Sequence, residues 1–183
     1  KTDEELLRLR QAGYNGLTIG VETGDDTALA FMRKGYTSRD ILVQCRRLEQ
    51  TDIEYGFFYL TGISGKGRGE AGAKASAEVF NQLHPFLVGP NMLTIYPESD
   101  LYQEIQYGNW AEEGELEKYR ELRTLVENLN ISTYFAAMGA SNAFQLRGKL
   151  PEGKEKLLAT LDRIISQVSE EDLRSYRDNL PHL

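Results

Sequence analysis

The segment 62–72, GISGKGRGEAG, has the glycine content of loops that cradle phosphates. Within it, GRGEAG matches the G-x-G-x-x-G spacing of dinucleotide-binding turns. Such a turn directly follows a strand, and an acid ends the next strand about twenty residues later. Here the match begins five residues after Gly62, and the next apolar segment ends in Tyr-Pro. Lys66 precedes Gly67 rather than Ser or Thr, which excludes a P-loop. A flexible lid or a solvated loop is the better interpretation.

Residue types for metal or nucleophilic chemistry are sparse. Cys45 is the single cysteine, which excludes an internal disulfide and a cysteine-rich metal cage within the chain. It falls at an apolar helix position, where we expect it buried and inert. His84 and His182 are far apart in sequence, so we expect neither to bind a metal. No serine lies in a G-x-S-x-G context, so a hydrolase triad has no support.

Composition places the chain among ordinary globular domains. It has 183 residues, of which 40% are hydrophobic and 27% charged, with a net charge of -7. Acidity argues against wrapping by nucleic acid, although tyrosines near Lys66 and Arg68 could stack bases. Core and interface packing explains those tyrosines more simply. No stretch approaches the ~20 apolar residues of a membrane span, and KTDEELLRLR is not a signal peptide. We therefore expect a cytoplasmic protein without membrane contact.

Strands and helices alternate in the first half of the sequence. Thr2 and Glu5 form a capping box that begins a helix over 3–12. Apolar runs predict strands over 16–22, 54–62 and 90–96. The intervening helices are expected from Asp25 or Asp26 to about Lys34, from Ser38, and over about 71–84. This alternation predicts an α/β fold with a parallel sheet covered by helices.

The second half reads mostly as helices. Helices are expected over about 99–106, 112–129, 152–168 and 170–179, with a last strand or an extended segment at 132–138. Three parallel strands cannot close a barrel and leave apolar edges. The expectation is half of a partial (β/α) TIM-type barrel, with parallel strands in 1–110, whose amino-terminal half has been removed. A helical carboxy-terminal region, 111–183, packs on the same core. We expect such a half-barrel to self-associate through its exposed strand edges.

Three segments in order resemble the later half of the radical S-adenosylmethionine (SAM) barrel. They are GLTIGVETGDDTALAFMRKGYT (16–37), FFYLTGISG (57–65) and NMLTIYPESDLY (91–102). A fourth, SNAFQLRGKLP (141–151), resembles the tail of uncharacterised bacterial members of the same superfamily. The resemblance is strongest to the branch with oxygen-independent coproporphyrinogen oxidase, the Elongator catalytic subunit and tRNA methylthiotransferases. It implies a full-length parent enzyme that binds SAM and a [4Fe–4S] cluster through C-x-x-x-C-x-x-C. This chain lacks that motif, so we expect it to retain neither cofactor and to be inactive alone.

The resemblance also implies roles for individual residues. Glu22 would accept hydrogen bonds from the SAM ribose, and Lys34 would face the SAM carboxylate. Leu60 would contact the adenine face, and Gly62 would let the backbone approach the ring edge. The alternatives are a solvated or helix-capping Glu22, an ordinary helix C-terminal Lys34, with Arg33 as a less favoured substitute, and a plain core strand.

Residues after these segments complete the predicted site. Ile95 and Tyr96 would end the third strand and finish the adenine pocket, or Tyr96 is only core. Ser141, Asn142 and Arg147 either line the substrate side of the barrel mouth or supply the turn of a loop. The substrate itself is not legible in the sequence. The rival hypothesis is a free-standing α/β binding or scaffolding domain that never held a cluster.

Overall fold

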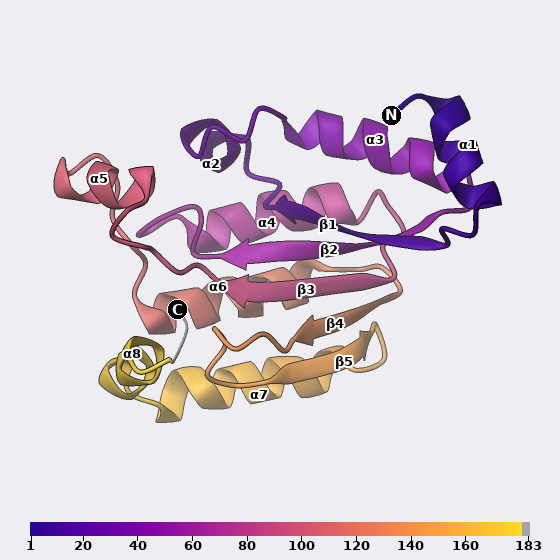
Figure 1. The fold of residues 1–183 in the computed structure, drawn as a ribbon. Coiled ribbons are helices and arrows are strands. Elements are labelled where there is room, and N and C mark those ends of the chain that lie inside the picture. The colour runs from indigo at the N-terminus through magenta and orange to yellow at the C-terminus, as the bar shows by residue number, and fades with distance from the viewer. Residues whose placement is uncertain (181–183) are drawn as a thin grey trace.

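The structure is a computed structural model that describes residues 1–180. Its centre is one five-stranded sheet in the order β1-β2-β3-β4-β5 (Figure 1). The first four strands run parallel, and β5 is antiparallel to β4. The strands span Gly16–Glu22, Glu54–Thr61, Leu87–Met92, Thr133–Ala137 and Leu146–Leu150, in that order. The predicted α/β architecture with a parallel sheet is confirmed.

Helices connect the consecutive parallel strands β1 to β4, and further helices precede β1 and follow β5. They are α1 Asp3–Gln11, α2 Asp26–Phe31, α3 Ser38–Glu49, α4 Gly69–Phe80, α5 Asp100–Gln106, α6 Glu115–Asn128, α7 Lys154–Gln167 and α8 Glu170–Asp178. The capping box of Thr2 and Glu5 is present, and Asp25 caps α2 through the Thr27 N–H. In Figure 1, α4, α6 and α7 run along the strands, while α2 and α5 lie beyond the carboxyl ends of β1 to β3.

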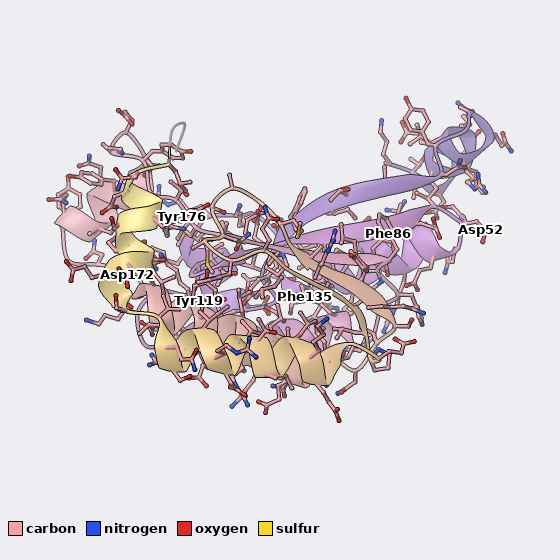
Figure 2. The ribbon with its side chains drawn as sticks, turned by 90° about the horizontal axis from the view of Figure 1, so that it is seen from below. Asp52, Phe86, Tyr119, Phe135, Asp172 and Tyr176 are labelled. Carbon is pink, nitrogen blue, oxygen red and sulfur yellow. The ribbon has the colours of Figure 1, made fainter. Side chains whose placement is uncertain are left out.

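The two faces of the sheet differ in what covers them. On one face Tyr55, Phe57 and Tyr59 are at most 1% exposed, and the ring of Phe57 packs 4.8 Å from that of Phe80 in α4. Figure 2 shows Phe135 in the layer between the sheet and α7. Alternate residues point the other way, and there Phe58 is 45% exposed. We call this second side the open face.

Residues of the open face form rows across the strands. Gly20 lies beside Phe58, which lies beside Gly89, so a large ring is flanked by two residues without side chains. No helix of residues 1–180 runs along this face in Figure 2. A parallel sheet normally has both faces covered, which is why a one-sided parallel sheet is the signature of an incomplete layer. The geometry is that of a partial barrel wall with its inner side uncovered.

Several predicted boundaries need correction. The third strand ends at Met92 rather than at residue 96, so Ile95 and Tyr96 lie beyond it. The helix expected at 71–84 begins earlier and ends at Phe80. Of the two interpretations of 132–138, the strand is confirmed, because Thr133–Ala137 is the parallel strand β4. The strand β5 was not predicted, so the carboxy-terminal region contains more than helices and β4. One continuous hydrophobic core joins residues of both halves of the chain.

Candidate functional site

The carboxyl end of β1 brings two predicted site residues together. The Lys34 Nζ atom lies 3.6 Å from the Glu22 Oε1 atom, and both side chains are partly exposed. Glu22 has a φ of 62°, and its side chain folds back over Gly20. A Cβ atom on Gly20 would stand 2.8 Å from the Glu22 Oε1 atom, so glycine leaves the room that the carboxylate occupies. The pair therefore sits at the rim of the open face.

The turn after α2 aims Lys34 at this rim. The Lys34 N–H donates to the Leu29 carbonyl at 3.0 Å and closes the end of the helix. Tyr36 supports the same corner by donating its hydroxyl to the Gly20 carbonyl at 3.2 Å. Arg33 points elsewhere, because its guanidinium lies 3.9 Å from Asp100 and 3.8 Å from Glu104 of α5. Of the two basic residues, Lys34 is the one placed beside Glu22.

Leu60 and Gly62 have different surroundings. Leu60 is half-buried and lies beside Asn91 in an open-face row. Gly62 has a φ of 92° and faces α6, because a Cβ atom there would stand 3.1 Å from the Lys118 Cε atom. Its N–H donates to the Glu121 Oε2 atom at 2.7 Å. The Gly62 backbone is thus engaged with α6 within the chain itself.

Ile95 and Tyr96 line a cavity of about 280 Å³ together with Arg174 and Arg177 of α8. Tyr96 is 47% exposed, so it is not a core residue. Its carbonyl accepts the Ser99 hydroxyl at the start of α5. The predicted adenine pocket would need Ile95 and Tyr96 beside Leu60. That grouping stays a prediction, because the cavity lined by Ile95 and Tyr96 is also lined by Arg174 and Arg177 of α8 and not by Leu60.

The three tail residues divide between two roles. The Ser141 hydroxyl accepts the Met92 N–H at 3.1 Å, and the Asn142 amide donates to the Pro90 carbonyl at 3.1 Å. Both side chains are buried and fasten the loop after β4 to the end of β3. Arg147 lies in β5 beside Ala136, exposed on the open face. Only Arg147 therefore projects freely on the side where a substrate could lie.

The other residues weighed for chemistry have ordinary surroundings. Cys45 is buried, and burial raises the pKa of its thiol to about 12, so it stays protonated and unreactive. The His84 Nδ1 atom lies 3.1 Å from Glu49, and His182 lies outside the described residues. Within residues 1–180 no three acidic, histidine or cysteine side chains cluster as metal ligands. No helix in that range is long and apolar enough to cross a membrane.

Sequence reasoning missed a buried carboxyl pair near the end of β2. Glu113 and Glu121 are both 0% exposed. Glu121 accepts hydrogen bonds from the Tyr59 hydroxyl and from the Gly62 N–H. Glu113 receives no donor from the described residues, and burial, followed by the charge of Glu121, raises its pKa. Burial also raises the pKa of Glu121. The pair therefore holds a proton, on Glu113, because Glu121 has the donors that stabilise an anion.

A second buried cluster surrounds Lys118. Its ammonium is 0% exposed and lies 2.7 Å from Glu112 and 3.1 Å from Glu115. Glu115 also pairs with Arg174 at 3.0 Å and with Arg177 at 3.2 Å. These charges flank the apolar stripe of α6, where a helical wheel predicts a solvated face. Arg174 and Arg177 of α8 complete this cluster, and no local sequence pattern shows that α8 packs against α6.

Comparisons with known proteins inform the fold. The chain matches no protein-family model and no curated protein. Among solved structures it is similar to an Elp3 of the archaeon Methanocaldococcus infernus with an N-terminal deletion, with a TM-score of 0.56 and 13% sequence identity. The similarity covers 70% of this chain and 30% of that chain. This likeness shows a shared fold over most of the chain, which spans under a third of its neighbour.

Proposed function

We propose that this chain is one wall of the barrel of a radical SAM enzyme and that Glu22 and Lys34 face the bound SAM. The observation that carries the proposal is the Glu22–Lys34 pair at the carboxyl edge of an uncovered parallel sheet. Catalytic and cofactor groups gather at that edge in α/β barrels because the loops following the strands meet there. The fold that the chain shares with an Elp3 supports the same assignment.

The residues of the open face suit an adenosyl ligand. The Phe58 ring is 45% exposed there between Gly20 and Gly89, and Leu60 supplies an apolar contact in the next row. A carboxylate accepts both protons of a vicinal diol, and an ammonium pairs with a carboxylate. Without SAM, the charges of Glu22 and Lys34 partly neutralise each other. Bound SAM would replace this contact, with its ribose hydroxyls beside Glu22 and its carboxylate beside Lys34. Bound together with its cluster, SAM supplies a radical that abstracts hydrogen.

The iron–sulfur cluster does not fit residues of this chain. Cys45 is its single cysteine and is buried among apolar side chains of α3 and the sheet. The proposal therefore assigns the cluster ligands to another part of the parent protein, in the cytoplasm, where cysteine thiols are kept reduced. Within this chain the proposal keeps Leu60 as an adenine contact and Arg147 as a substrate contact. Gly62, Ile95 and Tyr96 stay weaker candidates.

Equilibrium dialysis of SAM against the cluster-loaded parent protein tests the proposal. Glu22→Gln keeps the size of the side chain but removes its charge, and Lys34→Gln removes the cation. Each change is expected to raise the Kd for SAM about tenfold, the loss of one charge-assisted hydrogen bond. The matched controls, Glu78→Gln and Lys74→Gln, alter exposed residues of α4 on the covered side of the sheet. Unchanged SAM affinity in both rim variants would contradict the roles of Glu22 and Lys34, and a parent protein that holds no cluster and binds no SAM would support the rival, a free-standing binding or scaffolding domain.

A further inference from the structure

A second cavity lies beyond the carboxyl end of β2, apart from the Glu22–Lys34 rim. Its volume is about 230 Å³, and it opens between α2, the glycine-rich loop and residues 109–111. The residues that give it chemical character are Phe31, Ser64, Lys66, Arg68, Asn109 and Trp110. We call it the Trp110 pocket. Neither Glu22 nor Lys34 lines it.

Backbone contacts build the walls of the Trp110 pocket. Gly65 and Gly67 have φ values of 81° and 77°, which turn the loop sharply. The N–H of Lys66 donates to the Ala111 carbonyl at 2.9 Å and ties the loop to the opposite wall. The Trp110 ring lies against Gly65, since a Cβ atom there would stand 2.7 Å from the indole Nε1 atom. Trp110 is therefore packed against the loop at Gly65.

The charge of the lining is opposite to that of the chain. The net charge of the chain is -7, yet the pocket is lined by two cations and by no carboxylate. Arg68 is held by Asp25, which does not line the pocket: its Nη2 atom lies 3.3 Å from the Asp25 Oδ2 atom. The Arg68 side chain is 49% exposed. Lys66 is exposed, and no carboxylate of residues 1–180 lies within ion-pairing distance of its ammonium. One cation is thus positioned and the other is available to a ligand.

We propose that the Trp110 pocket binds a small phosphorylated molecule that carries a flat ring. Lys66 and Arg68 bind the phosphate, because a cation and a guanidinium give charge-assisted hydrogen bonds to phosphate oxygens. Phe31 and Trp110 contact the ring, since aromatic faces stack on planar groups. The Ser64 hydroxyl, which donates to Asp25 at 3.1 Å, adds an oxygen acceptor beside them. The cavity, at about 230 Å³, lies below the usual range of roughly 300–1,000 Å³ for small-molecule sites, which favours a small ligand over a long polymer.

The pocket supplies its own probe, because Trp110 is the single tryptophan of the chain. Tryptophan fluorescence of the 183-residue protein is followed during titration with AMP, ribose 5-phosphate, inorganic pyrophosphate and adenosine. We expect a saturable change with AMP and binding at least tenfold weaker with adenosine, which lacks the phosphate. Ribose 5-phosphate and pyrophosphate should bind more weakly than AMP, because they lack the flat aromatic base.

Variants assign the signal to the pocket. Lys66→Gln should weaken AMP binding about tenfold, and because this side chain makes no ion pair in residues 1–180, the variant keeps the fold. Arg68→Gln should act likewise, with far-ultraviolet circular dichroism to check folding. Lys74→Gln removes an exposed cation outside the pocket and should leave AMP binding unchanged. Glu22→Gln should also leave AMP binding unchanged. The last control separates this site from the proposed SAM rim.

Three results would overturn the proposal. The first is the absence of any saturable fluorescence change with AMP. The second is equal weakening in Lys66→Gln and Lys74→Gln, which would mean attraction by overall charge. The third is an oligoribonucleotide that binds more than tenfold tighter than AMP, which would assign the pocket to nucleic acid. None of these depends on whether the parent protein binds SAM.

Discussion

The ammonium of Lys34 lies 3.6 Å from the carboxylate of Glu22, a residue whose backbone adopts the left-handed conformation with a φ of 62°. The register of β1 against β2 shifts between Gly20 and Glu22, so the strand turns at the point where this pair forms. A left-handed conformation costs a non-glycine residue on the order of 1 kcal/mol. The contact thus occupies a strained position at the rim of the open face.

Replacing Glu22 by glycine or by alanine separates strain from pairing. Both changes remove the contact with Lys34, but only glycine adopts a φ of 62° without penalty. Glu22→Gly should therefore be more stable than Glu22→Ala by about 1 kcal/mol in urea unfolding. Equal unfolding free energies for the two variants would show that the backbone at residue 22 is not strained.

The buried pair of Glu113 and Glu121 predicts a loss of stability as pH rises. Burial raises the pKa of both groups above the ordinary value of 4.5, so between that value and the folded-state pKa the native state binds more protons than the unfolded state. Stability is then fully present below about pH 4.5 and decreases with rising pH, by up to about 1.4 kcal/mol per pH unit for one proton. Urea unfolding across that range measures the slope.

Glu113→Gln tests the position of the proton. A glutamine amide donates permanently to Glu121, as the protonated Glu113 does, so the slope should flatten and the variant should exceed the parent in stability at alkaline pH. Glu78→Gln, an exposed change in α4, serves as the control and should keep the slope of the parent. A Glu113→Gln variant with an unaltered slope would place the titration elsewhere.

Close packing of α4 against the loop after β1 predicts a sharp glycine effect. A Cβ atom on Gly24 would stand 2.7 Å from the Ser76 Cα atom, which is backbone and cannot swing aside. Gly24→Ala should therefore lower the unfolding free energy by about 1–3 kcal/mol. At Gly16 the nearest atom would be 3.5 Å away, so Gly16→Ala should cost far less. Comparable losses in thermal unfolding would contradict the packing described for α4.

We propose that the isolated chain self-associates through the open face and the free edge of β1. Among residues 1–180, β1 pairs only with β2, and Phe58 and Tyr134 expose 45% and 42% of their surface on the open face. A second copy would bury both the unpaired edge and the apolar rings. Sedimentation at tens of micromolar should show oligomers that Phe58→Lys and Tyr134→Lys weaken. A monomeric profile of the unaltered chain would refute this proposal.

Much of the fold could be predicted from the sequence, because the local sequence patterns agree with the tertiary structure. The capping box of Thr2 and Glu5, the apolar run 16–22 and the aromatic run that forms β2 all adopt the predicted structures. β5 was missed because LRGKL places Arg147 and Lys149 on the uncovered face and Gly148 against Leu157, which hides the alternation of a strand. The third strand was placed too late, because LTIY following Met92 has strand-like composition without a pairing partner in the register.

The candidate site was only partly predictable for a similar reason. The family resemblance gave Glu22 and Lys34 separate roles beside SAM, and the contact between their side chains was not predicted. The burial of Lys118 and Glu121 was not visible, because it depends on residues such as Tyr59 and Arg174 that are distant in sequence. Buried charges of this kind persist only when partners from several elements meet. Contacts between residues so distant in sequence form only in the tertiary structure, so no local sequence pattern predicts them.

The most direct test of the central claim is an assay of the parent protein for 5′-deoxyadenosine. The protein that contains this chain is reconstituted anaerobically with iron and sulfide, mixed with SAM and reduced. If the chain is a wall of a radical SAM barrel, 5′-deoxyadenosine and methionine form in equal amounts, and Glu22→Gln and Lys34→Gln slow their formation. Recovery of intact SAM from a fully cluster-loaded protein would contradict the assignment.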